Sequence, residues 1–260
     1  MSSPAPFRIA SWNLAYYRRV WRLNLMSTFA QPMLYLLGLG VGVGSLVDRN
    51  TSSGDALGGI PYAAYVAPGL LVTSAMTVAS TESMWPIMGN LRWSRGYHGI
   101  AATPLDATDI VLGHATWIAI RAGLTSTLVA IALACFSDTR HSGLVPAVLV
   151  AAVVGLSFAM PIMAYSLVCE QDGAFAAIQR FVLIPLFLFG GAFYPLTQLP
   201  TFVQWLAKAF PLWHGVVVSR SLTTGSFDVG TGIAHVAYAA VWAAVGTTIA
   251  VHNLRKRLYS

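Results

Sequence analysis

The sequence predicts an all-α integral membrane protein, and composition is the first reason. Hydrophobic residues make up 56% of the 260 residues, whereas Asp, Glu, Lys and Arg together make up 9%. Soluble domains carry roughly 25% charged residues. The formal net charge is +6, but the basic residues stand at the ends of apolar runs instead of forming one patch. Such charges orient helices in a lipid membrane, so we expect no nucleic-acid partner.

Six apolar runs are the second reason, because each is long enough to cross a hydrocarbon core of about 30 Å as a helix. They cover residues 23–47, 62–85, 110–136, 144–168, 174–193 and 230–251. No linker or low-complexity segment divides them, so residues 1–260 are expected to form a single membrane domain of six transmembrane helices. An even number of spans leaves both termini on the same side.

An amphipathic segment over residues 7–22 precedes the first span. Its apolar side chains recur in steps of three and four, at Phe7, Ala10, Leu14, Tyr17 and Trp21. This periodicity, with arginines around it, predicts an interfacial helix lying among the lipid headgroups. A plain juxtamembrane anchor fits the same pattern, and the residues alone leave both interpretations open.

Glycines recur at alternate positions near the far end of the first span, at Gly38, Gly40, Gly42 and Gly44. They form two overlapping small-xxx-small pairs, which predict a surface where another helix packs closely. A nucleotide-binding role is excluded, because no strand precedes these glycines and the GxGxxG spacing is absent.

The distribution of basic residues predicts the orientation of the spans. Ten fall on the side of the termini and of the 89–109 loop, namely Arg8, Arg18, Arg19, Arg22, Arg92, Arg95, Arg180, Arg255, Lys256 and Arg257. Four fall on the other side, namely Arg49, Arg140, Lys208 and Arg220. By the positive-inside rule, both termini and the 89–109 loop are therefore expected in the cytoplasm. Two lysines against thirteen arginines indicate a GC-rich bacterial source, so the membrane is expected to be the inner membrane of a bacterium.

Glycine and proline break the chain between the fifth and sixth spans. The fifth span ends at Gly190 and Gly191, Pro195 follows, and a short amphipathic segment stops at Pro211. Half-elements too short to cross a bilayer predict an extracytoplasmic re-entrant region over residues 194–229. Irregular backbone at that depth persists only when it is buried in protein or lines a wet cavity, so we interpret the region as a lid over a pathway. An ordinary interfacial loop is the alternative.

The sequence contains no motif for an energy source of its own. A GxxxxGK[ST] phosphate loop is excluded, because neither lysine is preceded by glycine. Glu82 and the other acids of the spans lie near the expected cytoplasmic ends, which disfavours an ion-coupled carrier. Arg121 is the charge deepest inside a span. Such a residue marks a charged partner or a wet cavity, or else it snorkels toward the headgroups.

Catalytic and metal sites find little support in the sequence. The six histidines are scattered and the two cysteines form no cluster, so no metal site is expected. Gly155 and Ser157 offer half of a GxSxG element, but position 159 is Ala. The chain is therefore expected to be no enzyme by itself and to be driven through its cytoplasmic surface. The 89–109 loop has an apolar middle that could seat in a groove on a partner.

Two blocks of the sequence resemble the permease subunits of type-2 ABC exporters, in the branch of nodulation lipo-oligosaccharide exporters and daunorubicin-type drug exporters. The first block, residues 73–114, contains the run A-T-P-L-x-x-x-D-I-V-L-G from Ala102 to Gly113. The second block, residues 190–220, contains Y-P-L-x-x-L-P and a later P-L-x-H. Together with the expected spans, the resemblance covers nearly the whole chain.

The resemblance implies a homodimer served by two copies of a separate ATP-binding cassette subunit, which would hold ATP and Mg, while this chain holds no cofactor. It makes residues 89–109 a cytoplasmic coupling loop and gives Arg121 a role at the pathway or the interface. Contacts that couple to the ATPase are expected at Glu82, Arg92, Arg95, Ile100, Thr103, Pro104 and Leu105. An outer gate is expected at Gly190, Gly191, Tyr194, Pro195, Leu199, Pro200, Pro211 and His214.

The sequence therefore predicts the membrane-spanning subunit of an ATP-driven exporter that works by alternating access. An amphipathic or lipid-like cargo fits the apolar spans, and multidrug or natural-product efflux with antibiotic resistance would follow from a drug cargo. Aromatic residues such as Phe181, Phe187 and Phe189 either bind cargo or face lipid and core. The alternatives are an ion-coupled secondary transporter and an intramembrane enzyme with Ser157 as its nucleophile.

Overall fold

The computed structural model describes residues 5–49, 57, 59–94, 96–101 and 103–259. Within these residues the regular elements are all helices, so the all-α prediction is confirmed. Five of the described helices are long and apolar enough to cross a membrane. They cover Ala30–Val47, Tyr62–Trp93, Ala107–Ala134, Leu144–Val168 and Val229–Tyr259.

The expected fifth span is built from shorter pieces. Residues Gly173–Phe189 form an apolar helical segment that is shorter than the roughly 20 residues of a full span. It consists of α9 (Gly173–Ile178), the π-helical turn η4 (Gln179–Leu183) and α10 (Ile184–Phe189). The prediction of six complete spans therefore stays a prediction.

The N-terminal helix continues past the boundary that the sequence suggested at residue 22. Helix α1 runs unbroken over Ala5–Tyr35, and the π-helix η1 (Leu36–Val43) and α2 (Gly44–Val47) follow it. Ala10 is buried, whereas Phe7, Leu14 and Trp21 are exposed. These three side chains are seven residues apart, so one face of α1 is apolar and uncovered by the rest of the chain.

The remaining helices follow the expected spans closely. After α4 (Tyr62–Glu82) come α5 (Trp85–Met88), η2 (Gly89–Trp93) and α6 (Gly96–Ala101). The next are α7 (Ala107–Ala134), η3 (Ser137–Thr139) and α8 (Leu144–Val168). A capping box of Asp106 and Asp109 starts α7, which explains why the helix begins three residues before the expected span. The last are η5 (Leu196–Gln198), α11 (Thr201–Ala209), α12 (Pro211–Thr224) and α13 (Val229–Tyr259).

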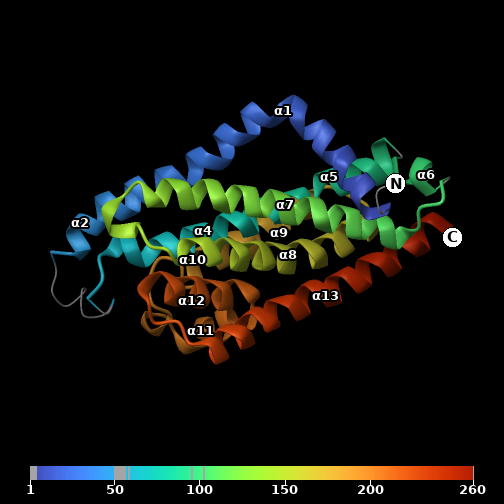
Figure 1. Cartoon of the computed structure of the whole chain (residues 1–260). Coiled ribbons are helices and arrows are strands. Elements are labelled where there is room, and N and C mark those ends of the chain that lie inside the picture. Colours follow the sequence, from blue (N-terminus) through green and yellow to red (C-terminus); the bar gives the residue numbers. More distant parts are fainter. Residues whose placement is uncertain (1–4, 50–56, 58, 95, 102, 260) are drawn as a thin grey trace.

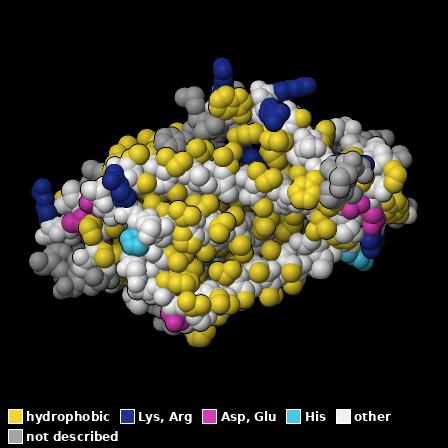
Figure 2. Space-filling view, viewed as in Figure 1, with side chains coloured by type: hydrophobic (Ala, Val, Ile, Leu, Met, Phe, Trp, Pro, Cys, Tyr) yellow, Lys and Arg dark blue, Asp and Glu magenta, His cyan; other side chains and the backbone are white. Residues whose placement is uncertain are grey.

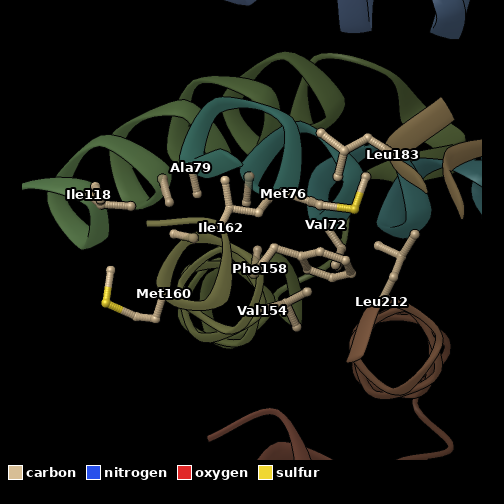
Figure 3. Packing of buried hydrophobic residues seen from close by; sticks show 14 of the residues in the cluster. Val72, Met76, Ala79, Ile118, Val154, Phe158, Met160, Ile162, Leu183 and Leu212 are labelled. Carbon is tan, nitrogen blue, oxygen red and sulfur yellow. The ribbon is translucent and has the colours of Figure 1, made fainter. Parts of the chain in front are cut away.

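Helix α8 lies at the centre of the bundle and packs against α4, α7, α12 and α13. Small residues allow the close approach, because a Cβ on Gly246 of α13 would lie 2.5 Å from Pro161 of α8. Figure 3 shows Phe158 and Ile162 of α8 among the side chains that fill the space toward Val72 of α4.

The row of glycines in the first span packs only in part. Gly40 and Gly44 face α4, where a Cβ on Gly40 would lie 3.6 Å from that of Ala63. Among the described residues, a Cβ on Gly38 or on Gly42 would meet no other helix within 4 Å. The alternate spacing explains this difference, because positions two apart lie on different sides of a helix.

The molecule has two ends separated by a largely apolar belt, from which basic side chains project only along the upper edge formed by α1 in this view (Figures 1 and 2). The start of α1, helix α6 and the end of α13 lie together, and we name this the α6 end. Helices α2, α11 and α12 lie toward the opposite end, which we name the α12 end. At the α6 end, Arg255 of α13 bonds the carboxylate of Asp106 at 2.6 Å. The first and last described residues therefore lie at the same end.

Candidate coupling and gating sites

An ion pair between the buried Arg121 and the partly buried Glu82 joins two of the predicted site residues. Arg121 of α7 donates from Nε to Oε1 of Glu82 on α4 over 3.1 Å, and the indole of Trp117 donates to Oε2 over 3.2 Å. The Arg121 guanidinium lies 4.2 Å from the ring centroid of Tyr17 on α1. Arg121 is only 5% exposed. The snorkelling interpretation is therefore wrong, because the charge points into the bundle and is paired there.

This cluster fastens three helices that are far apart in sequence. The ring of Tyr17 also meets the ring of Trp117 edge to face, with centroids 5.7 Å apart. Removing one member of a buried pair leaves an uncompensated charge, which costs about 3–5 kcal/mol. The sequence assigned Glu82 to coupling and Arg121 to the pathway separately. In the structure they form one unit between α1, α4 and α7.

A second buried contact ties α6 to α7. Tyr97 is fully buried, and its hydroxyl lies 2.9 Å from Nε2 of His114. Their rings pack edge to face at 5.4 Å. His114 and Arg121 are seven residues apart, so both contacts lie on one face of α7. Sequence reasoning missed this pair. The signal was an aromatic residue among polar neighbours and glycines in the 89–109 loop.

The other predicted coupling residues are distributed over the surface and interior of the α6 end. Thr103 and Pro104 are exposed, whereas Ile100 and Leu105 are half-buried against the core. Arg92 turns inward, and its Nη2 donates to the carbonyl of Cys169 at the end of α8 over 2.8 Å. Arg95 lies outside the described residues.

Trp93 is a surface residue that the sequence reasoning missed. Its side chain is 66% exposed beside α6. A large exposed aromatic side chain is a typical anchor for a protein partner. The exposed part of this end therefore combines Trp93 with His98, Thr103 and Pro104.

At the α12 end, the broken segment is tightly packed. Gly191 has a φ of +82°, which favours glycine. A Cβ on Gly190 would lie 2.6 Å from Leu212 of α12. Pro200 precedes the first residue of α11, and Pro211 is the first residue of α12, where the missing N–H of proline carries no cost. The short amphipathic segment predicted to stop at Pro211 corresponds to α11, which ends at Ala209.

The remaining gate residues differ in exposure. Tyr194, Pro195 and Leu199 are half-buried in the segment before α11. Helix α11 leaves Phe202 and Trp205 exposed, on an amphipathic helix at the edge of the molecule. This exposure fits a helix that rests in the membrane interface.

His214 connects the two outer helices to α13. Its Nδ1 lies 2.6 Å from Nδ1 of His235, and its Nε2 lies 2.9 Å from the carbonyl oxygen of Lys208. Because a carbonyl can only accept, Nε2 of His214 must carry a proton. In the neutral pair, His235 therefore donates and His214 accepts. The ring of Tyr238 stacks on His214 at 4.2 Å.

A narrow groove with hydroxyl groups runs between α1, α4, α7 and α10. Its cavity measures about 40 Å³, and its lining includes Gln31, Ser74, Thr77, Thr125 and Phe187. Within it, Ser74 and Thr77 donate to carbonyls four residues earlier in α4, at 2.6 and 2.8 Å. Their oxygens keep lone pairs directed away from the helix, which gives an apolar wall a polar stripe.

The three phenylalanines of the fifth span segment have different surroundings. Phe187 packs inward against Tyr35, with ring centroids 5.2 Å apart. Phe181 and Phe189 are exposed on the outside of the chain. Phe187 is therefore the one of these three that the structure places at the groove.

The comparison with known proteins agrees with this arrangement. Residues 8–223 match the family described as ABC-2 type transporter. The chain belongs to this family. An ABC-2 type transporter chain is a membrane component of a transport system, and the apolar bundle with its uncovered faces fits that class.

Several relatives match most of this chain. Nodulation protein J of Rhizobium meliloti (strain 1021) is 31% identical over 252 residues, which cover 96% of this chain and 93% of that protein. The protein of the same name from Rhizobium leguminosarum bv. trifolii gives the same identity and coverage. Inner membrane transport permease YadH of Escherichia coli (strain K12) is 27% identical over 221 residues, which cover 82% of this chain and 80% of that protein.

Proposed function

We propose that this chain is the membrane-spanning half of an exporter that a separate ATP-binding subunit drives. The observation that carries the proposal is the connection from α6 to the interior. An exposed surface with Trp93 and Pro104 lies beside a short helix that Tyr97 anchors to α7. A partner that moves this surface would move α7 with it, because Tyr97 and His114 are both buried.

The Glu82–Arg121 pair carries the displacement to the other helices. A push on α7 acts directly on α4 through the ion pair and on α1 through Tyr17. Helices α1, α4, α7 and α10 surround the groove that contains Thr77 and Phe187. Their rearrangement would open the groove for an amphipathic cargo, which an apolar wall with hydroxyl groups suits.

Two copies of this chain would complete the pathway, with two copies of the ATP-binding subunit, ATP and Mg on the cytoplasmic side. The apolar faces that the single chain leaves uncovered, on α1 and on α13, suit contact with lipid and with a second copy. The α6 end would lie in the cytoplasm and the α12 end outside, with residues 194–229 as the outer gate. The name of the related Escherichia coli permease supports placement in the inner membrane.

Everted membrane vesicles test this proposal directly. The chain is expressed with the ATP-binding subunit that co-purifies with it, and uptake of fluorescent amphipaths, including an anthracycline and a labelled lipid-linked oligosaccharide, is followed. Uptake is expected to require ATP and the partner, and to persist when an ionophore dissipates the proton gradient. Uptake that continues without the partner, or that stops with the ionophore while ATP is present, would support an ion-coupled carrier instead.

A further inference from the structure

A second cavity at the α12 end contains a fixed positive charge. It measures about 370 Å³, and its lining includes Ile60, Tyr65, Val217, Arg220 and Thr224. Two of these side chains are aliphatic, one is aromatic, one is a hydroxyl and one is a guanidinium. The cavity therefore offers both an apolar wall and a cation at the end of the molecule where cargo would leave.

Arg220 is held in place by main-chain carbonyls. Its Nε donates to the carbonyl of Tyr65 over 3.2 Å, and its Nη2 donates to those of Gly191 and Ala192 over 2.8 and 3.4 Å. The guanidinium also lies 3.7 Å from the ring centroid of Tyr65. Arginine has five N–H donors, so the two on Nη1 remain.

No acidic side chain in the described part of the chain forms an ion pair with Arg220. The hydroxyls of the cavity do not supply an anion either. Thr224 donates to the carbonyl of Arg220, which leaves Ser226 to donate to Thr224. An adjoining hollow, which shares Ile60 and Thr224, carries Asp138 and Arg140 and so adds no net negative charge.

We propose that this cavity binds the oxyanion group of an amphipathic molecule, a carboxylate, sulfate or phosphate whose apolar portion lies against Ile60 and Val217. The two N–H groups of Nη1 would donate to the oxyanion. Because three donors already fix the guanidinium, little side-chain entropy is lost when the anion binds. Charge-assisted hydrogen bonds of this kind are about twice as strong as neutral ones.

Two sources supply this chemistry, an anionic lipid headgroup and an acidic cargo. The assignment to cargo rests on the proposed export function, whereas oxyanion binding by itself does not. In the export cycle, the site would receive the charged end of the cargo beside Gly191 and the outer gate. As a lipid site, it would hold a phosphate of the outer leaflet permanently.

The test measures binding of octyl sulfate to the purified chain in phosphatidylcholine nanodiscs. The probe is kept below its critical micelle concentration, and octyl glucoside is the uncharged comparison. Octyl sulfate is expected to bind saturably and octyl glucoside at least tenfold more weakly. The variant Arg220→Gln is expected to lose at least tenfold in affinity. Arg140→Gln, which removes an exposed arginine at the same end, is the matched control and is expected to bind as the parent does.

A second variant protects the test against a folding defect, because Arg220 also holds the broken segment. Thr224→Glu places a carboxylate in the cavity and leaves the bonds from Arg220 to Gly191 and Tyr65 intact. It is expected to keep the melting temperature of the parent and to lose octyl sulfate binding. Equal binding of the two octyl probes, or full binding by Thr224→Glu, would overturn the proposal.

A third arm separates the two sources of the oxyanion. Nanodiscs that contain phosphatidylglycerol are expected to leave octyl sulfate binding unchanged if the site is open for cargo. If phosphatidylglycerol competes with octyl sulfate in the parent chain but not in Thr224→Glu, the site binds lipid. That result would overturn the assignment to cargo, and the proposal of oxyanion binding would stand. If no ATP-binding subunit supports transport but Arg220→Gln still loses octyl sulfate binding, the proposed function fails and the site stands.

Discussion

Arg121 illustrates how a single buried charge organises the bundle. Its side chain bonds Glu82 at 3.1 Å and lies over the ring of Tyr17, so three helices share one contact. In a low-dielectric interior, the pair is held in place because either member alone would be a costly buried charge. Arg121 therefore contributes to stability and also fixes the relative positions of the three helices.

Single and double substitutions separate the effect of the ion pair on stability from its effect on transport. Glu82→Leu alone is expected to destabilise the purified chain by about 3–5 kcal/mol, because it leaves Arg121 unpaired. Glu82→Leu combined with Arg121→Met is expected to recover most of that loss, measured by thermal or denaturant unfolding in detergent. Transport in vesicles should stay impaired in the double variant. If the double variant is as unstable as the sum of its singles, the two charges do not interact in the folded chain.

The pairing of Arg121 with Glu82 was beyond what the sequence could predict. Both residues were identified as candidates, because charges in apolar spans stand out by composition. Which of them meet depends on the rotation of α4 and α7 about their axes, and composition does not fix that rotation. Tyr97 was missed for a related reason, because an aromatic residue among glycines and polar neighbours stands out in the sequence, but composition does not show whether its side chain is buried or exposed.

Helix α6 is the element through which a partner would act. It is six residues long, too short to be stable by itself, and the buried contact of Tyr97 with His114 holds it against α7. The exposed side of the same end carries Trp93. Substitutions can therefore disturb the docking of a partner at Trp93 and the transmission of its movement through Tyr97 separately.

Substitutions at these two positions are expected to give different defects. Trp93→Ala removes an exposed anchor, so the ATP-binding subunit should co-purify several-fold more weakly. Tyr97→Phe keeps the ring but removes the bond to His114, so the partner should still bind while less cargo moves for each ATP hydrolysed. The measurements are pull-down and the ratio of transport to hydrolysis. Equal behaviour of Tyr97→Phe and the parent in that ratio would contradict the role given to this contact.

The contact between α12 and α13 predicts a dependence on pH. Burial lowers the pKa of His214 below its usual value of 6.5, the carbonyl of Lys208 opposes this effect, and the charge of His235 adds to it. A depressed histidine pKa stabilises the folded chain fully above about pH 6.5, and this stabilisation is lost as the pH falls through the folded-state pKa. Two protons on the pair would also abolish its hydrogen bond.

The melting temperature of the parent chain is therefore expected to fall between pH 7.5 and pH 5 by several degrees more than that of His214→Gln. His141→Gln, which removes an exposed histidine at the same end, should keep the pH profile of the parent. Parallel profiles for the parent and His214→Gln would show that the His214–His235 contact does not respond to protons in this range.

Element boundaries were predictable where local signals mark them. The span at residues 144–168 has the bounds of α8, and the prolines at positions 200 and 211 mark the starts of α11 and α12. The boundary at residue 22 was wrong as a helix end, because a change from amphipathic to apolar composition does not interrupt backbone hydrogen bonding in α1. The interruption occurs at η1 instead, where glycine recurs.

At the scale of the whole molecule, the chain is an apolar bundle with distinct ends. The termini and α6 lie at one end, and α12 lies at the other (Figure 1). The uneven count of basic residues predicted which end faces the cytoplasm, and the structure adds which surface residues lie at each end. Lys208 is exposed at the α12 end, and His98 is exposed at the α6 end.

Cysteine labelling of intact cells tests that orientation. The background is Cys135→Ala with Cys169→Ala, because both native thiols are free. In this background, Lys208→Cys is expected to react with a membrane-impermeant maleimide from outside, and His98→Cys only after lysis. Labelling of His98→Cys in intact cells would reverse the topology and with it the side on which a partner must bind.

The bent course of α1 has a mechanical consequence. The helix is continuous from Ala5 to Tyr35, but it bends along its length (Figure 1), and Pro32 inside it removes one backbone hydrogen bond. A second weakened stretch follows in the π-helical turn from Leu36 to Val43. A tilt imposed at Ala5 is therefore absorbed in part by these flexible points, and only the remainder reaches the distal portion of the helix.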